Sequence, residues 1–74
     1  MVELDETRAK WAQVRDIFAA RIADGTLPRG SRVPSVVALS SEFGIASATA
    51  QKALSALRED GLIRTEPGLG SFVL

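Results

Sequence analysis

The most constraining feature of this 74-residue sequence is a pair of helical patterns separated by only three residues, Gly44-Ile45-Ala46. The first pattern places Val36, Leu39 and Phe43 on one side of a short helix. Gly44 follows at a position where helices commonly end, because glycine adopts a positive φ angle without strain. Two helices joined by so short a turn are typical of a helix-turn-helix.

The rest of the chain predicts one more helix before this pair. Apolar residues recur at helical spacing over residues 5–24, with Asp5 as the expected N-cap. The second helix is expected over residues 35–43, capped by Ser35, and the third over residues 47–60, capped by Ser47. The predicted apolar stripe of the first helix consists of Trp11, Val14, Phe18 and Ile22.

The last part of the chain, residues 62–74, predicts a β-hairpin. Two β-like runs, Leu62–Thr65 and Ser71–Leu74, flank the turn sequence Glu66-Pro67-Gly68-Leu69-Gly70. A hairpin directly after a helix-turn-helix predicts a winged helix-turn-helix. We therefore expect a mainly α fold with a small β-hairpin, that is, three helices plus a two-stranded wing, forming a single domain over residues 1–74.

The composition excludes several classes of function. The chain has no Cys and no His, which excludes disulfides, cysteine–histidine zinc sites and histidine acid–base catalysis. A chain this small has little room for a substrate pocket, and we predict no enzymatic activity, no metal and no cofactor. A membrane helix needs roughly 20 apolar residues, and no such run is present. The acidic N-terminus does not resemble a signal peptide, so we expect a cytoplasmic protein.

Five segments resemble the N-terminal DNA-binding domain of GntR-type bacterial transcription regulators. They are Trp11-Ala12-Gln13-Val14, residues 25–35 (GTLPRGSRVPS), Phe43-Gly44-Ile45, Gly61-Leu62-Ile63 and residues 68–73 (GLGSFV). The resemblance implies a homodimer that places its third helix in the major groove of double-stranded DNA, with the wing at the adjacent minor groove or backbone. It also implies an effector-sensing domain after the wing, so a small-molecule effector is expected only if a further domain exists. Whether the chain is a stand-alone reader or the N-terminal part of a longer regulator stays open.

The sequence departs from the family pattern at positions where the family usually has arginine. Val36-Val37 replaces Glu-Arg, Ala46-Ser47 replaces Ser-Arg, and Gln51 stands where another arginine is usual. Leu69 occupies the wing position often held by arginine. Because phosphate neutralisation supplies much of DNA affinity, we expect a monomer to bind weakly and a dimer to bind more tightly.

The third helix carries the candidate base contacts. Its stripe of Ala50, Ala53, Leu54 and Leu57 is expected to face the core, which leaves the opposite side free for DNA. There, Gln51 suits adenine, Lys52 suits guanine or a phosphate, and Ala48 suits a thymine methyl group. The predicted DNA contacts are Arg32, Ser35, Ser47, Ala48, Thr49, Gln51, Lys52, Ser55, Arg64, Gly68 and Gly70.

Other interpretations of these residues stay open. Ser35 and Ser47 are helix caps whether or not DNA is bound, Gly68 and Gly70 suit the hairpin turn, and Trp11 suits the core or a dimer contact. The formal net charge is zero, although residues 28–64 carry five Lys or Arg against three Asp or Glu. Two alternative functions therefore compete with transcription regulation. One is an accessory DNA-binding protein in recombination or replication; the other is a protein-interaction module that has lost strong DNA binding.

Overall fold

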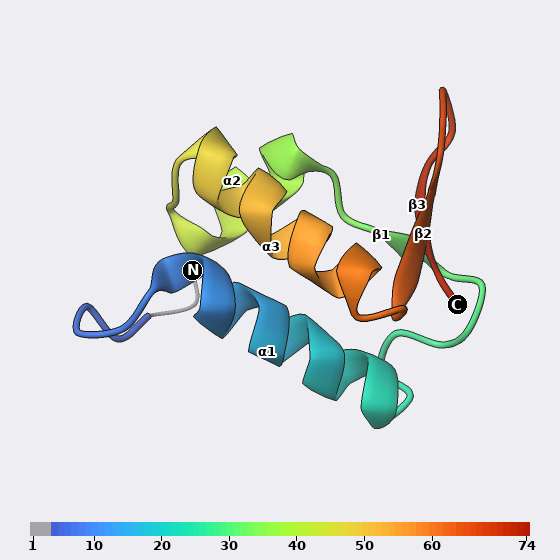
Figure 1. Ribbon diagram of the computed structural model, residues 1–74, viewed down its shortest axis with the longest axis horizontal. Helices are drawn as coiled ribbons and strands as arrows, with labels where there is room; N and C mark the ends of the chain where they lie inside the picture. Colours follow the sequence, from blue (N-terminus) through green and yellow to red (C-terminus); the bar gives the residue numbers. More distant parts are fainter. Residues whose placement is uncertain (1–3) are drawn as a thin grey trace.

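The computed structural model, which describes residues 4–74, contains three helices with a small sheet at one end (Figure 1). Helices α1 and α3 lie side by side, α2 packs against α3, and a hairpin projects beyond the helices. The predicted winged helix-turn-helix is therefore confirmed, while residues 1–3 of the expected domain lie outside the described residues. The elements are α1 (Lys10–Ala23), β1 (Arg32–Val33), α2 (Val36–Phe43), α3 (Ser47–Glu59), β2 (Ile63–Glu66) and β3 (Gly70–Val73).

Helix α1 begins at Lys10, so the predicted start at residue 5 is wrong. Asp5 does not cap the helix, because its Oδ1 accepts hydrogen bonds from the backbone N–H and hydroxyl of Thr7, at 2.8 and 2.6 Å. Buried Gln13 then holds this turn against the helix. Its Oε1 accepts from the N–H of Asp5 at 2.7 Å, and its Nε2 donates to the carbonyls of Asp5 and Arg8 at 2.6 and 3.1 Å. These bonds satisfy backbone groups that a longer helix would have satisfied itself.

The helix-turn-helix is formed by α2 and α3. Ser35 caps α2, since its Oγ accepts from the N–H of Ala38 at 3.2 Å, and Gly44 ends it with a left-handed φ of 64°. Helix α3 begins at Ser47 rather than after it, so the predicted capping by Ser47 is wrong. Ala46 is the N-cap residue, with an extended backbone and no side-chain cap. Ser47 therefore belongs to the first helical turn instead of capping it, and the helix ends at Glu59, one residue before the predicted end.

The core lies where the three helices meet the sheet. The apolar stripe of α3 is buried as predicted, and Val14 and Phe18 of α1 pack with Leu39 and Phe43 of α2. The rings of Phe18 and Phe43 meet edge to face with centroids 6.0 Å apart, a favourable aromatic geometry. Trp11, Ile17 and Ile22 lie partly buried at the margin of this core.

The sheet has three strands rather than the two that the sequence predicts. β2 pairs with β3 as the predicted hairpin, and β1 adds to the other edge of β3, giving the antiparallel order β1-β3-β2. Arg32 and Arg64 both lie opposite Phe72 in this register. Strand β1 is only two residues long and precedes a proline, so it has no alternating pattern of its own. It therefore depends on its pairing with β3, far along the chain.

Candidate nucleic-acid interface

Helix α3 presents one polar side to solvent. Ala48, Gln51 and Lys52 are exposed, while Thr49 and Ser55 are half-buried at the margins of the same side. The first turn of α3 contains no acidic residue, so no side-chain carboxylate there offsets the positive end of the helix dipole. This end of the helix is therefore suited to an anion such as a phosphate.

The serines at the starts of α2 and α3 have different environments. The Ser35 oxygen accepts the capping bond from Ala38, which leaves its O–H able to donate to a further acceptor. Ser47 is exposed and makes no capping bond in α3. Both hydroxyls can therefore donate to a phosphate, although only Ser35 also serves the fold.

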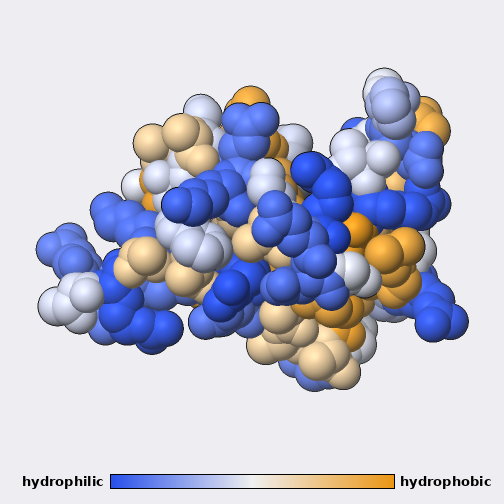
Figure 2. Space-filling model, viewed as in Figure 1, coloured by the Kyte–Doolittle hydropathy of each residue, from blue (hydrophilic) through white to orange (hydrophobic). Residues whose placement is uncertain are grey.

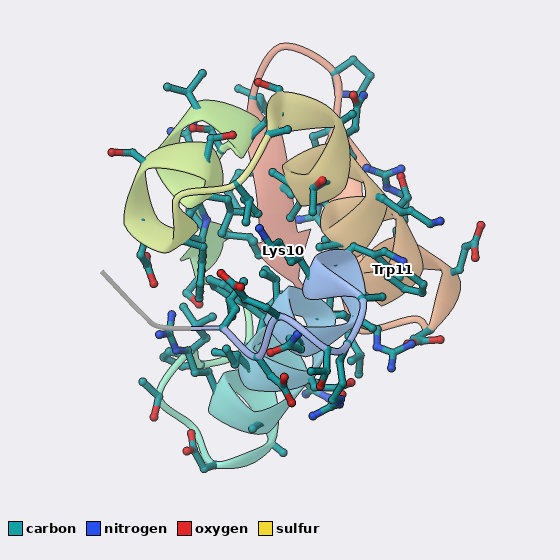
Figure 3. The ribbon with its side chains drawn as sticks, turned by 90° about the vertical axis from the view of Figure 1, so that its left-hand side faces the viewer. Lys10 and Trp11 are labelled. Carbon is teal, nitrogen blue, oxygen red and sulfur yellow. The ribbon has the colours of Figure 1, made fainter. Side chains whose placement is uncertain are left out.

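Lys52 is held toward α1 by an aromatic ring. Its Nζ lies 4.8 Å from the centroid of Trp11, and the guanidinium of Arg15 lies 5.5 Å from the same centroid. Figure 3 shows Trp11 beside α3 and Lys10 pointing away from it on the other side of the helix start. Cation–π attraction thus restricts the ammonium of Lys52. The sequence did not predict this contact.

The wing brings the other predicted residues together. Gly68 and Gly70 flank Leu69 with φ angles of 77° and 122°, and Leu69 is 64% exposed. Figure 2 shows hydrophobic colour at the tip of the projecting hairpin. Arg64 lies over the ring of Phe72, 5.3 Å from its centroid, and pairs with Glu66. Its charge is therefore partly neutralised within the wing.

Arg58 is a basic residue of this interface that sequence reasoning missed. It lies in the last turn of α3, and its Nε donates to Thr65 Oγ1 on β2 at 3.0 Å. A hollow of about 230 Å³ lies between α3 and the sheet, and Gln51, Arg58 and Arg32 are among the residues that line it. The sequence spacing could have predicted this position. Arg58 follows Gln51 by seven residues, which is about two helical turns, so both residues lie on the same side of the helix.

The charges are distributed unevenly over the molecule. Four arginines form ion pairs: Arg8 and Arg15 with Asp16, Arg21 with Glu42, and Arg64 with Glu66. Within residues 4–74, five cations have no acidic partner within 4 Å, and three of them belong to α3 or the sheet. The five cations without such a partner are Lys10, Arg29, Arg32, Lys52 and Arg58. Figure 2 shows a largely hydrophilic face over α1 and α3.

Two features are absent from the part of the chain that the structure describes. Across residues 4–74, no cluster of three or more Asp or Glu side chains is arranged to hold a metal ion. In the same part of the chain, no helix has the length and apolar character needed to cross a membrane.

The sequence of this chain matches a known protein family. Residues 10–73 match the family described as bacterial regulatory proteins, gntR family. The chain belongs to the gntR family. The match covers α1, the helix-turn-helix and the wing, so this GntR-family chain carries the winged-helix DNA-binding domain of a transcription regulator. Membership of a family of DNA-binding regulators also confirms that the chain is not an enzyme.

Two curated relatives illustrate the likeness. The GntR-family domain is 36% identical over 73 residues to an HTH-type transcriptional regulator of Rhizobium meliloti (strain 1021), covering 99% of this chain and 30% of the relative. It is also 36% identical over 63 residues to the histidine utilization repressor of Pseudomonas aeruginosa, covering 85% of this chain and 25% of that protein. The chain therefore spans less than a third of the length of these relatives.

Solved structures share both fold and sequence with the GntR-family domain. The AraR DNA-binding domain in complex with operator ORR3 has a TM-score of 0.83 and 31% identity, over 88% of this chain and 78% of that one. A GntR family transcriptional regulator from Listeria monocytogenes has a TM-score of 0.90 and 26% identity, over 95% of this chain and 61% of that one. One of these neighbours was thus solved on its operator DNA.

Proposed function

We propose that this GntR-family domain regulates transcription by binding operator DNA as a homodimer in the bacterial cytoplasm. Helix α3 of each subunit would enter a major groove, with the wing at the adjacent minor groove or backbone. The observation that carries the proposal is the placement of Arg32, Lys52 and Arg58 around the exposed side of α3 and the sheet. None of the three has an acidic partner within residues 4–74.

The side chains of α3 suit different parts of a DNA duplex. Gln51 is exposed at the centre of the outward side and can bond both N6 and N7 of an adenine. Ala48 can contact a thymine methyl group, and the hydroxyls of Ser47 and Thr49 suit phosphate oxygens. We assign base reading to Gln51 and Ala48, and backbone positioning to the hydroxyls and cations.

The expected affinity follows from the small number of free cations. Each neutralised phosphate contributes about −0.9 to the slope of log K against log salt concentration. Three phosphate contacts per subunit give a slope of about −2.7, and a dimer on two half-sites gives roughly twice that value. Binding by one subunit should therefore be weak, which supports a dimer as the functional unit.

Fluorescence anisotropy with labelled duplexes tests the proposal. One duplex comes from upstream of the protein's own gene and the other is scrambled, and each is titrated at low and physiological salt. We expect preferential binding to the upstream duplex that weakens in Lys52→Glu. Arg29→Glu is the matched control, because it makes the same change in net charge at an exposed loop residue outside the interface. Equal affinity of Lys52→Glu and Arg29→Glu would contradict docking through α3.

A second variant separates base reading from general attraction. Gln51→Ala should lose about 1–3 kcal/mol on duplexes that carry the contacted adenine, and nothing on duplexes changed at that base pair. A uniform loss on all duplexes would show that Gln51 contributes to the fold or to phosphate contacts instead. Analytical ultracentrifugation of the same complexes would give the number of subunits per duplex.

The alternative functions make different predictions for the same titrations. Equal and salt-sensitive binding to both duplexes would favour an accessory DNA-binding protein. A protein-interaction module would need a continuous apolar surface, and the exposed Val37 and Leu69 lie on α2 and the wing tip, which are separate in Figure 1. No binding to either duplex would favour that module despite this separation.

A further inference from the structure

Arg32 and Gly70 are in close contact on the sheet. Gly70 opens β3 with a φ of 122°, and a Cβ atom at this position would lie 3.1 Å from Nε and 3.2 Å from Nη2 of Arg32. Real Cβ contacts are seldom so short, so the guanidinium occupies the space that a side chain at position 70 would need. The other positive-φ glycine next to the wing, Gly61, has no atom within 4 Å of such a Cβ.

The strand register explains how the two residues meet. Arg32 lies opposite Phe72 on β3, and paired residues of antiparallel strands point to the same side of the sheet. Gly70 precedes Phe72 by two residues and therefore faces that side as well. The side chain of Arg32 thus runs diagonally from β1 across β3, toward the wing tip.

This path brings a free positive charge to a wing tip that has none of its own. The tip sequence Glu66-Pro67-Gly68-Leu69-Gly70 contains no Lys or Arg. Arg64 lies beside it but pairs with Glu66. Arg32 is exposed, and within residues 4–74 no acidic group lies within 4 Å of it.

We propose that Arg32, borne by β1 and placed by the missing side chain of Gly70, supplies the phosphate contact of the wing. The proposal rests on the DNA-binding function proposed above and deepens it. An arginine is well suited to this task, because its planar guanidinium can donate two parallel hydrogen bonds to a phosphate. Gly70 is accordingly a positioning residue, and Arg32 makes the contact.

Salt-dependent binding of the wild-type domain and four variants to the duplex from upstream of its own gene tests the proposal. Arg32→Gln should lower affinity about tenfold near physiological salt and reduce the salt slope by about 0.9 per subunit. Arg32→Lys should keep the slope, because the charge remains. Gly70→Ala should keep the slope but lower the affinity by less than Arg32→Gln does, because the new methyl group shifts the guanidinium by a few tenths of an ångström and leaves its charge in place. The double variant Arg32→Gln/Gly70→Ala should have the same slope as Arg32→Gln alone.

Gly61→Ala is the control for backbone strain at a positive φ. It places a methyl group at a positive φ of 75° next to β2 without touching Arg32, so its affinity and salt slope should equal those of the wild type. A wild-type slope in Arg32→Gln would overturn the assignment of Arg32. Equal affinities of Gly70→Ala and Gly61→Ala would overturn the positioning role of Gly70.

A measurement on the free protein distinguishes this proposal from the proposed function. The NMR resonance of the Arg32 Nε–H should shift in Gly70→Ala and stay unchanged in Gly61→Ala. An unchanged resonance in Gly70→Ala would overturn the placement of Arg32 whether or not DNA binds. If Arg32 is found beside Gly70 but the wild type binds no duplex, the proposed DNA-binding function is wrong. The phosphate contact assigned to Arg32 is then wrong as well.

Discussion

The Nε atom of Arg58 donates a hydrogen bond to Oγ1 of Thr65 at 3.0 Å, which joins the last turn of α3 to the wing. Thr65 Oγ1 in turn lies 3.0 Å from the Oγ of Ser71, its partner on β3. The contact chain therefore runs from α3 across both strands of the hairpin. Because the wing otherwise projects from the helices (Figure 1), this chain constrains its orientation relative to α3.

Replacing Thr65 by valine should loosen the wing without unfolding the domain. The change removes both hydroxyl contacts and keeps the branched shape. Because the groups are exposed, we expect a loss of at most about 1 kcal/mol in unfolding free energy. Backbone ¹⁵N relaxation should show increased motion in residues 66–70. Ser71→Ala is the control, since it keeps the bond between Arg58 and Thr65. Equal motion in both variants would show that the bond to Arg58 does not restrain the wing.

Gln13 should be required for the turn that precedes α1. Its side chain makes three hydrogen bonds to the backbone of Asp5 and Arg8. Gln13→Leu should lower the unfolding free energy by about 1–3 kcal/mol, because the backbone groups lose their partner. Hydrogen exchange of the Asp5 amide should accelerate as well.

Gln13→Glu separates the donor and acceptor roles of this residue. An ionised glutamate can still accept from the N–H of Asp5 but cannot donate to the two carbonyls. We therefore expect slower exchange of the Asp5 amide than in Gln13→Leu, with a stability still below that of the wild type. Identical exchange in the two variants would contradict the assigned bond to Oε1.

Ser40→Ala should stabilise the protein. The Ser40 hydroxyl is buried, and it has no hydrogen-bond partner within the described part of the chain. Removing an unsatisfied polar atom and adding a better helix former should together raise the unfolding free energy by about 1–2 kcal/mol. Urea denaturation would measure this as a higher midpoint with an unchanged slope.

Ser41→Ala is the matched control for this substitution. Ser41 is exposed on the same helix, so its replacement changes only helix propensity. We expect the unfolding free energy to rise by about 0.5 kcal/mol. A larger gain in Ser40→Ala than in Ser41→Ala would support the cost of the buried hydroxyl. Equal gains would mean that the hydroxyl has no such cost.

The turn after α1 should make a pH-dependent contribution to stability. The side chain of Thr26, and then its backbone N–H, which donates to Asp24 Oδ1 at 2.8 Å, lower the pKa of Asp24 below its ordinary value. A carboxyl group whose pKa is lower in the folded state stabilises the fold above its ordinary pKa. That contribution disappears as the pH falls through the lowered pKa.

Thr26→Val tests this contribution. The side chain of Thr26 is the larger cause of the shift, so removing its hydroxyl should raise the pKa of Asp24 toward the ordinary value. An NMR titration of the side-chain carboxyl carbons would measure the change. Asp5 is the internal reference, because its pKa is lowered in the same way by Thr7 and should not move. An unchanged pKa of Asp24 would assign the shift to the backbone N–H.

Much of the interface could be predicted because helical periodicity assigns side chains to faces. The spacing of Ala50, Ala53, Leu54 and Leu57 places Gln51 on the outward side of α3, where the structure finds it exposed. Its partners could not be predicted in this way. The contact of Lys52 with Trp11 and that of Arg32 with Gly70 join residues about 40 positions apart. Such contacts depend on how the helices and strands are packed.

The sequence by itself determined three helices, the glycine-terminated turn at Gly44 and a hairpin, because helix stripes and glycine conformations are local properties. Only the tertiary structure decided where α1 begins, since Gln13 bonds the preceding backbone in place of further helix. It also decided that β1 exists, because two residues form a strand only when β3 supplies their hydrogen-bond partners. For the same reason, it decided that a cation from β1 lies at the wing, where the local sequence has none.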